Sequence, residues 1–225
     1  MSDFTQILLG TIVSLLPIVN PFSVAVTFIS LSKDMDDGKR NRQALLASVY
    51  MATVLIVFLI AGVLIMKFFG ISLPGIRIAG GIIITYIGFR MLNPEHREPQ
   101  LQGAGVIPAA DDDIAFTPIA MPMLSGPGAI AVTVGMAANA DSRFEYVGET
   151  LGIIVVAVIS YILLRIAGSV KNLLGDYGIT ILTHILGFLL ICIGVQFVML
   201  GFHDFILDED FSRPVLEMIK EVWRR

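Results

Sequence analysis

Near its N-terminus the chain reads Leu16-Pro17-Ile18-Val19-Asn20-Pro21-Phe22-Ser23, in the middle of an apolar run from Ile7 to Leu31. Each proline lacks a backbone N–H, so the carbonyl group four residues before it loses its helical hydrogen-bond partner. A bare carbonyl in an apolar medium is costly unless it is buried in protein or lines a wet cavity. Asn20 places a polar side chain at the same point. The stretch predicts a break in an otherwise apolar helix, and such a break suggests a binding site.

A second stretch repeats this pattern. It reads Met121-Pro122-Met123-Leu124-Ser125-Gly126-Pro127-Gly128 and also lies inside an apolar run. Ser125 follows Asn20 by 105 residues, and Pro127 follows Pro21 by 106. The two breaks therefore occupy matching positions in the two halves of the chain.

The composition sets the fold class. Of the 225 residues, 56% are hydrophobic and only 15% are charged. A soluble domain carries nearer a quarter charged residues, so the chain is typical of an all-α, multi-pass membrane protein whose first partner is the lipid bilayer. A bilayer core needs about 20 apolar residues per helix, which predicts six transmembrane helices, with helices 1 and 4 broken. The predicted spans cover residues 5–31, 43–68, 75–92, 114–138, 146–170 and 179–206.

The composition also excludes several classes of protein. No Walker-type glycine loop is present, so ATP is not expected to drive this chain. A net charge of −4 with scattered basic residues gives no nucleic-acid footprint. The single cysteine, Cys192, rules out an intrachain disulfide and a CxxC redox pair. We expect neither a cofactor nor a metal site.

The second half of the chain repeats the first beyond the two breaks. Gly175 follows Gly70 by 105 residues, and Gly187 follows Gly81 by 106. A nearly constant offset through three pairs of spans indicates two three-helix repeats. Because three is odd, the second repeat starts on the opposite side of the membrane, and the repeats are inverted about a pseudo-two-fold axis. The predicted units are the first repeat, a central loop, the second repeat and a tail, at residues 1–92, 93–113, 114–206 and 207–225.

Basic residues in short loops predict the orientation, because they are enriched on the cytoplasmic side. The basic residues fall into two sets, one on each side of the membrane. The side with the larger set is predicted to be cytoplasmic, so both termini would face the periplasm. The two sets are Lys33, Lys39, Arg40, Arg42, Arg90, Arg97, Arg165 and Lys171 against Lys67, Arg77 and Arg143. In the tail, apolar residues recur at helical spacing from Phe211 to Val222, which indicates an amphipathic helix on the membrane surface.

Several motifs are similar to those of a known family. They are Asn20-Pro21, Asn41-Arg42-Gln43, Gly70-Ile71-Ser72-Leu73-Pro74-Gly75-Ile76-Arg77-Ile78-Ala79-Gly80-Gly81, Ala120-Met121-Pro122, Ser125-Gly126-Pro127-Gly128, Gly187-Phe188-Leu189-Leu190 and Gly194-Val195-Gln196-Phe197. Together they resemble the MarC family of six-span bacterial and archaeal membrane proteins and, more distantly, the LysE superfamily of exporters. The match covers nearly the whole chain apart from the central loop and the tail. The resemblance implies a bacterial inner-membrane location and, from some relatives, transport of small neutral amino acids such as alanine and glycine.

The two breaks form the predicted substrate site. In an inverted repeat, two broken helices meet near the middle of the bilayer. Half-helix N-termini offer free N–H groups and a positive dipole to a carboxylate, and freed carbonyl groups accept from an ammonium group or bind Na⁺. A zwitterionic amino acid needs both. The predicted substrate-binding residues are Pro17, Asn20, Pro21, Ser23, Ser125, Gly126, Pro127 and Gly128.

Three further residues are candidates for gating or coupling, and each has a structural alternative. Arg77 lies near a span end, where its side chain could simply reach the interface. His184 is a candidate proton carrier or a packing histidine, and Gln196 a ligand or a contact between helices. No Asp or Glu lies deep in a predicted span, so a carboxylate relay is not expected, and the coupling ion is left open between Na⁺ and H⁺. Gly81 and Gly187 are interpreted as close helix contacts.

Three functional classes are compatible with these features. A secondary transporter working by alternating access fits the paired breaks best, and a channel or passive pore is second. The third is an intramembrane serine hydrolase with Ser125 and His184 as a dyad. Met123 stands where a nucleophile elbow has glycine, and no orienting acid accompanies His184, so this signal is weak. We therefore predict a transporter of a small-molecule substrate rather than an enzyme. The sequence does not decide the direction of transport or whether the chain forms a homo-oligomer.

Overall fold

The computed structural model describes residues 3–93, 113–140 and 142–207. Within these ranges every regular element is a helix, as the composition predicts. The predicted central loop (93–113) and amphipathic tail (207–225) lie outside the described residues except at their boundary positions. Both therefore stay predictions.

Four helices form the first half of the chain. They are α1 (Asp3–Val19), α2 (Pro21–Leu31), α3 (Asp37–Phe69) and α4 (Leu73–Leu92). The Asp36 side chain accepts hydrogen bonds from the N–H groups of Gly38 and Lys39 and so caps α3. Gly70 ends α3 with a φ of 65°, a conformation that favours glycine. Two residues later, Ser72 caps α4.

Four more helices form the second half. They are η2 (Ala115–Leu124), α5 (Pro127–Asn139), α6 (Arg143–Arg165) and α7 (Ala167–Leu207). The π-helix η2 has extended backbone at Thr117 and Met121, and the peptide bonds before both of its prolines are cis. Ser142 caps α6, and Gly175, with a φ of 63°, interrupts the helical backbone inside α7. Gly175 and Gly70, which match in the sequence repeat, thus both have positive φ.

The helices give four to six candidate membrane spans. Four are long and apolar enough to cross a bilayer alone: α3, α4, α6 and residues Tyr177–Leu207 of α7. Two bent pairs add up to two more, with α1 and α2 at 43° and η2 and α5 at 64°. The predicted starts of the second and fifth spans, residues 43 and 146, are late. The helices begin at Asp37 and Arg143, because polar caps rather than the first apolar residue start them.

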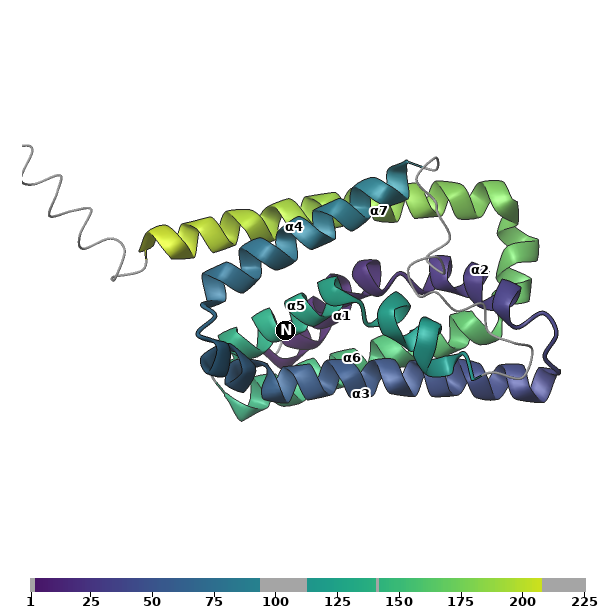
Figure 1. Cartoon of the computed structure of the whole chain (residues 1–225), viewed down its shortest axis with the longest axis horizontal. Coiled ribbons are helices and arrows are strands. Elements are labelled where there is room, and N and C mark those ends of the chain that lie inside the picture. Colours follow the sequence, from purple (N-terminus) through teal and green to yellow (C-terminus); the bar gives the residue numbers. More distant parts are fainter. Residues whose placement is uncertain (1–2, 94–112, 141, 208–225) are drawn as a thin grey trace, which may run out of the picture.

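The helices are arranged in three layers (Figure 1). The helices α4 and α7 run side by side in one outer layer, α3 and α6 form the other, and the bent pairs α1–α2 and η2–α5 lie between. Both α1 and α2 pack against α6, whereas η2 and α5 pack against α3. Likewise α5 packs against α4, and α2 against α7. The middle layer is therefore enclosed by helices from both halves of the chain, and it holds both bends.

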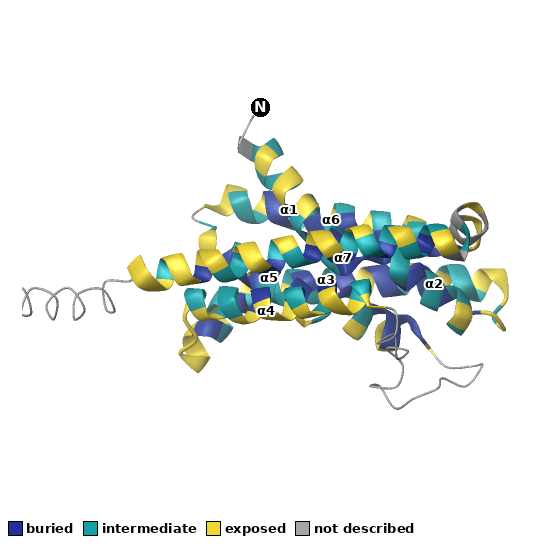
Figure 2. Cartoon of the chain, turned by 90° about the horizontal axis from the view of Figure 1, so that it is seen from above, coloured by how far each residue is buried: buried dark blue, intermediate teal, exposed yellow. Residues whose placement is uncertain are grey.

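The outer surface is apolar. Large exposed side chains such as Val57, Ile60 and Leu64 lie along α3. Figure 2 shows exposed residues along the outer sides of the helices, with buried residues where the helices meet. An apolar exterior of this extent suits the hydrocarbon of a bilayer rather than water.

Glycines bring α4 and α7 close together. A Cβ atom added at Gly81 would lie 2.5 Å from the Gly194 carbonyl oxygen, and one at Gly88 would lie 2.6 Å from that of Gly187. Such distances leave no room for a side chain, so glycine permits this approach of two backbones. The interpretation of Gly81 and Gly187 as close helix contacts is confirmed.

Candidate functional site

The first bend is built around Asn20. Its backbone is left-handed, with φ 42° and ψ 59°, and the residue is 7% exposed. The Asn20 side-chain oxygen accepts from the Ser23 N–H at 3.4 Å, so it caps α2. The side-chain nitrogen lies 3.7 Å from the sulfur of Met91 on α4. Pro17 and Pro21 are buried beside it. The local sequence therefore ends α1 and starts α2 at once.

The second bend is tighter and uses only backbone and hydroxyl groups. Ser125 is fully buried, and both its N–H and its hydroxyl donate to the Ala120 carbonyl, at 2.8 and 2.7 Å. A Cβ atom at Gly126 would lie 2.7 Å from the Pro122 carbonyl oxygen, so a side chain there would force the bend open. The Ser125 hydroxyl group is therefore already used as a donor within the second bend.

The two half-helices that leave the bends start differently. The N-cap residue of α2 is Asn20, whose side chain caps the first turn. The N-cap residue of α5 is Gly126, which has no side chain to do so. Pro127 occupies the first turn of α5, and the N–H groups of Gly128 and Ala129 follow it without a side-chain cap. A helix N-terminus of this kind carries a partial positive charge and unused donors.

The bends meet in the middle layer. A Cβ atom at Gly128 would lie 3.4 Å from the side chain of Ile18 and 3.2 Å from that of Ile84 on α4. Met91, also on α4, contacts Asn20. One face of α4 therefore borders both bends. Asn20 and Ser125 are not hydrogen-bonded to each other, because each is bonded within its own bend.

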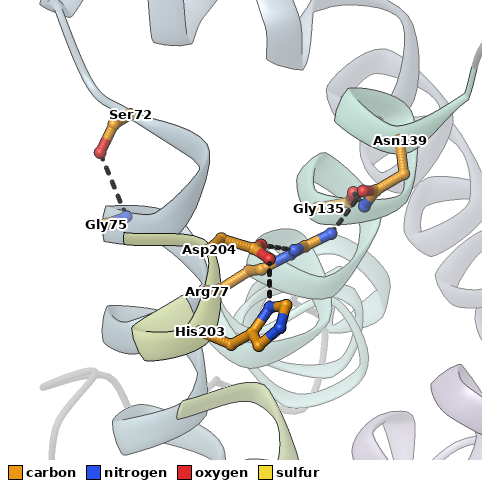
Figure 3. Close-up of polar contacts among 7 residues, drawn as sticks. All are labelled: Ser72, Gly75, Arg77, Gly135, Asn139, His203 and Asp204. Carbon is orange, nitrogen blue, oxygen red and sulfur yellow. Dashed lines mark hydrogen bonds and ion pairs between the residues drawn. The ribbon is translucent and has the colours of Figure 1, made fainter. Parts of the chain in front are cut away.

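Arg77 joins three helices at one end of the molecule (Figure 3). Its guanidinium group forms an ion pair with Asp204 of α7 and donates to the side-chain oxygen of Asn139 at the end of α5. The Arg77 side chain is only 14% exposed and that of Asp204 30%. The ring of His203 lies beside the same carboxylate, 3.3 Å away. Arg77 thus does more than reach the interface, and Asp204 is a partner that the sequence did not single out.

The other two gating candidates lie apart from the bends. His184 is half-buried on α7 and makes no hydrogen bond or ion pair with the described part of the chain. Gln196 is exposed on α7. The Ser125 hydroxyl donates to Ala120 and not to His184, so these two residues do not form a dyad. Among the residues that the structure describes, no group of His, Cys, Asp or Glu could hold a metal ion.

The prediction from sequence did not include two buried residues with long polar side chains. Gln43, in α3, is 6% exposed, and Glu149, in α6, is 8% exposed. Glu149 lies near a helix end rather than deep in a predicted span, yet other helices enclose it. One sequence signal was available, since Glu149 follows Gln43 by 106 residues, the offset of the repeat.

The fold and its apolar exterior define a multi-pass helical membrane protein. The chain belongs to the MarC family of integral membrane proteins, whose family model matches residues 5–206. It is 40% identical over 212 residues to the inner membrane protein MarC of Salmonella paratyphi A, covering 89% of this chain and 96% of that one. It is 39% identical over 212 residues to the protein of that name from Citrobacter koseri, with the same coverage. No solved structure matches the chain.

Proposed function

We propose that the protein is a secondary transporter of small neutral amino acids or similar small metabolites. The observation that carries the proposal is the meeting of two bent helices inside the bundle, where Gly128 lies against Ile18. An isolated kink would not need a counterpart at a matching position of the other half. In transporters, paired breaks of this kind form the substrate site, and alternating access moves the surrounding helices about it.

The bends offer both kinds of group that a zwitterion requires. The uncapped N–H groups of Gly128 and Ala129 would bind its carboxylate. Carbonyl groups freed by the prolines, together with the Asn20 side-chain oxygen, would accept from its ammonium group. The predicted substrate-binding residues remain our proposal for the site: Pro17, Asn20, Pro21 and Ser23 at the first bend, and Ser125, Gly126, Pro127 and Gly128 at the second.

We also propose that the two halves are inverted repeats. Under a two-fold exchange, Gly81 becomes Gly187 and Gly88 becomes Gly194, and the observed contacts are Gly81 with Gly194 and Gly88 with Gly187. A two-fold axis produces this crossed pattern, because each member of a pair contacts the counterpart of the other. The outer helices follow the same rule. The pair α1–α2 packs against α6, and the matching pair η2–α5 packs against α3.

We also propose an orientation and a location for the protein. The α2–α3 turn and the C-terminal ends of α4 and α6 carry Lys33, Arg90 and Arg165 at one end of the bundle. We propose that this end is cytoplasmic, that both termini are periplasmic and that the membrane is the bacterial inner membrane. The printed names of the relatives, inner membrane proteins, support this location.

Arg77 is proposed as part of a gate at the opposite end. Its contacts with Asp204 and Asn139 connect α4, α7 and α5. Opening a path from that end to the bends would require the three helices to separate, and this contact opposes the separation. A channel is the second candidate function, and the closed contact of α4 with α7 does not favour it.

Uptake into liposomes tests the proposal directly. Purified protein is reconstituted and given labelled alanine, glycine and other small amino acids, with and without a Na⁺ or proton gradient. We expect saturable uptake of at least one compound and exchange against the same unlabelled compound inside. Protein-free liposomes are the control. Single-channel currents without saturable uptake would instead select a pore.

A further inference from the structure

Two buried oxygen atoms stand out in the described part of the chain. The side-chain oxygen Oε1 of Gln43 and the oxygen Oε2 of Glu149 are inaccessible and have no hydrogen-bond partner. Buried polar groups are nearly always paired, so an unpaired one calls for an explanation. An unpaired carboxylate oxygen is the more costly of the two, because it carries charge.

The two residues occupy the same position in the two halves. The helix α3 starts at Asp37 behind the cap Asp36, and α6 starts at Arg143 behind the cap Ser142. Gln43 and Glu149 are each the seventh residue of their helix. The position is thus built in the same way twice, with an amide in one copy and a carboxyl group in the other.

Within the residues that the structure describes, the surroundings of Glu149 contain little that could neutralise a negative charge. Its neighbour Gly148 packs against Ile7 of α1, and Gly152 packs against Thr11. Neither α1 from Phe4 onward, nor α2, nor α5 contains an acidic, basic or histidine side chain. Lys67, on α3, is exposed at the end of its helix.

The nearest titratable groups on α6 itself do not balance that charge either. Glu145, one turn before Glu149, is also acidic. The Tyr146 hydroxyl already donates to the Ala137 carbonyl.

A proton fits this position better than Na⁺. Sites for Na⁺ in transporters are built from unwound backbone carbonyls, but α6 is helical throughout Arg143–Arg165. A protonated carboxyl group is neutral and planar. It has one hydrogen-bond donor, and its oxygen atoms can still accept. It therefore resembles the amide that fills the same position at Gln43.

We propose that Glu149 is the proton-binding carboxyl group that couples transport to a proton gradient. The inference rests on the proposed transport function and deepens it. A proton adds to a carboxylate oxygen of Glu149 in one state of the cycle and leaves from it in another. In this proposal α5 connects Glu149 with the substrate site. The first turn of α5 lies at the second bend, and its Ala137 carbonyl group accepts from the hydroxyl group of Tyr146, which lies one turn before Glu149.

Chemical labelling tests the protonation without any substrate. Dicyclohexylcarbodiimide reacts with protonated carboxyl groups in apolar surroundings, and peptide mass spectrometry locates the adduct. We expect an adduct on Glu149 that decreases from acidic to alkaline pH, that Na⁺ does not prevent and that Glu145→Gln retains. An unmodified Glu149 at every pH would overturn the proposal. Protection by Na⁺ at constant pH would also overturn it, in favour of a Na⁺ site.

Transport measurements test the coupling. The readout is the ratio of labelled alanine uptake with and without a proton gradient across the liposome membrane. We expect this ratio to fall to one in Glu149→Gln and to stay at the wild-type value in Glu145→Gln. A wild-type ratio in Glu149→Gln, or wild-type uptake that ignores the proton gradient, would overturn the coupling role. If wild-type protein transports none of the amino acids, the proposed function fails, while labelling still decides whether Glu149 exchanges protons.

Discussion

Asn20 combines a backbone role with unused hydrogen-bonding capacity. Asparagine tolerates its left-handed conformation better than most residues with a side chain do. The Ser23 N–H lies 3.4 Å from the Asn20 side-chain oxygen and 3.1 Å from its carbonyl oxygen, so two acceptors share one donor. Among the described residues, the hydrogen-bond partner of the side-chain nitrogen is the Met91 sulfur, a weak acceptor. In the site that we propose, the donors of Asn20 would bind the substrate.

Two substitutions of Asn20 separate these roles. Glycine keeps the backbone conformation, so Asn20→Gly should lower the free energy of unfolding by only a few tenths of a kcal/mol through the lost cap. Leucine lacks the local side-chain hydrogen bond that makes the left-handed conformation tolerable for asparagine, so Asn20→Leu should cost about 1–2 kcal/mol. We expect both variants to lose uptake of labelled alanine, and only Asn20→Leu to lose stability. Thermal unfolding in detergent and uptake into liposomes measure the two effects.

The matched control is Asn93→Leu, at an exposed position after α4, which should change neither quantity. Normal uptake by a well-folded Asn20→Gly protein would remove the side chain from the site. Asn20 would then serve only to turn the backbone.

Residues of the bends could be predicted from the sequence. For Glu149 the sequence offered its repeat relation to Gln43 but not its burial. Proline and glycine act through their own backbone chemistry, so Pro21 and Gly126 mark the bends wherever the chain places them. The burial of Glu149 results from the approach of α1 to Gly148 and Gly152, residues more than 130 positions away along the chain from Ile7 and Thr11. Local hydrophobicity does not contain that information.

At the scale of elements, glycines bring α4 and α7 closer together than any other two of the described helices. The sequence predicted which glycines would face a neighbour, because they recur with the repeat. It did not predict that Gly81 faces Gly194, since the partner depends on how far the antiparallel helices are shifted along each other.

A matched pair of glycine substitutions tests this contact. In a helix, replacing glycine by alanine normally stabilises by roughly 0.5–1 kcal/mol. At Gly10 of α1 nothing lies within 4 Å of an added Cβ atom, so Gly10→Ala should follow that rule. At Gly88 the added atom would meet the Gly187 carbonyl oxygen at 2.6 Å. Separating the backbones costs about 1–3 kcal/mol, so Gly88→Ala should melt at a lower temperature than the wild type.

The two melting temperatures should therefore move in opposite directions. Equal stability of Gly88→Ala and Gly10→Ala would show that α4 and α7 stand further apart in the membrane. Circular dichroism of both variants in the same detergent provides the comparison.

At the scale of the whole molecule, the orientation can be tested with single cysteines on a Cys192→Ser background. Asp34, before α3, and Ile71, between α3 and α4, are exposed at opposite ends of α3. If the end with more basic residues is cytoplasmic, a membrane-impermeant maleimide should label Ile71→Cys in intact cells. Asp34→Cys should react only after the cells are permeabilised. The reverse pattern would invert the proposed topology.

The all-helical membrane class followed from the sequence alone, and the six predicted spans compare with four to six candidate spans in the structure. The three layers did not follow from the sequence, because the pairings of α5 with α3 and of α2 with α7 join segments far apart along the chain. Apolar residues show that a helix is covered, by lipid or by protein, but not which neighbour covers it. The crossed pairing of the halves became visible only with the helices in place.

The ion pair of Arg77 with Asp204 also sets an order of events during synthesis. The two residues are 127 positions apart. At about 5–20 residues per second, the ribosome needs about 6–25 s to make the second after the first. For that time α4 has neither its counter-charge nor the glycine face of α7 beside it. Until α7 is made, the Arg77 guanidinium group has only the Asn139 side-chain oxygen as a partner among the contacts described above. A chain truncated before Asp204 would therefore retain an arginine without its counter-charge at the end of α4.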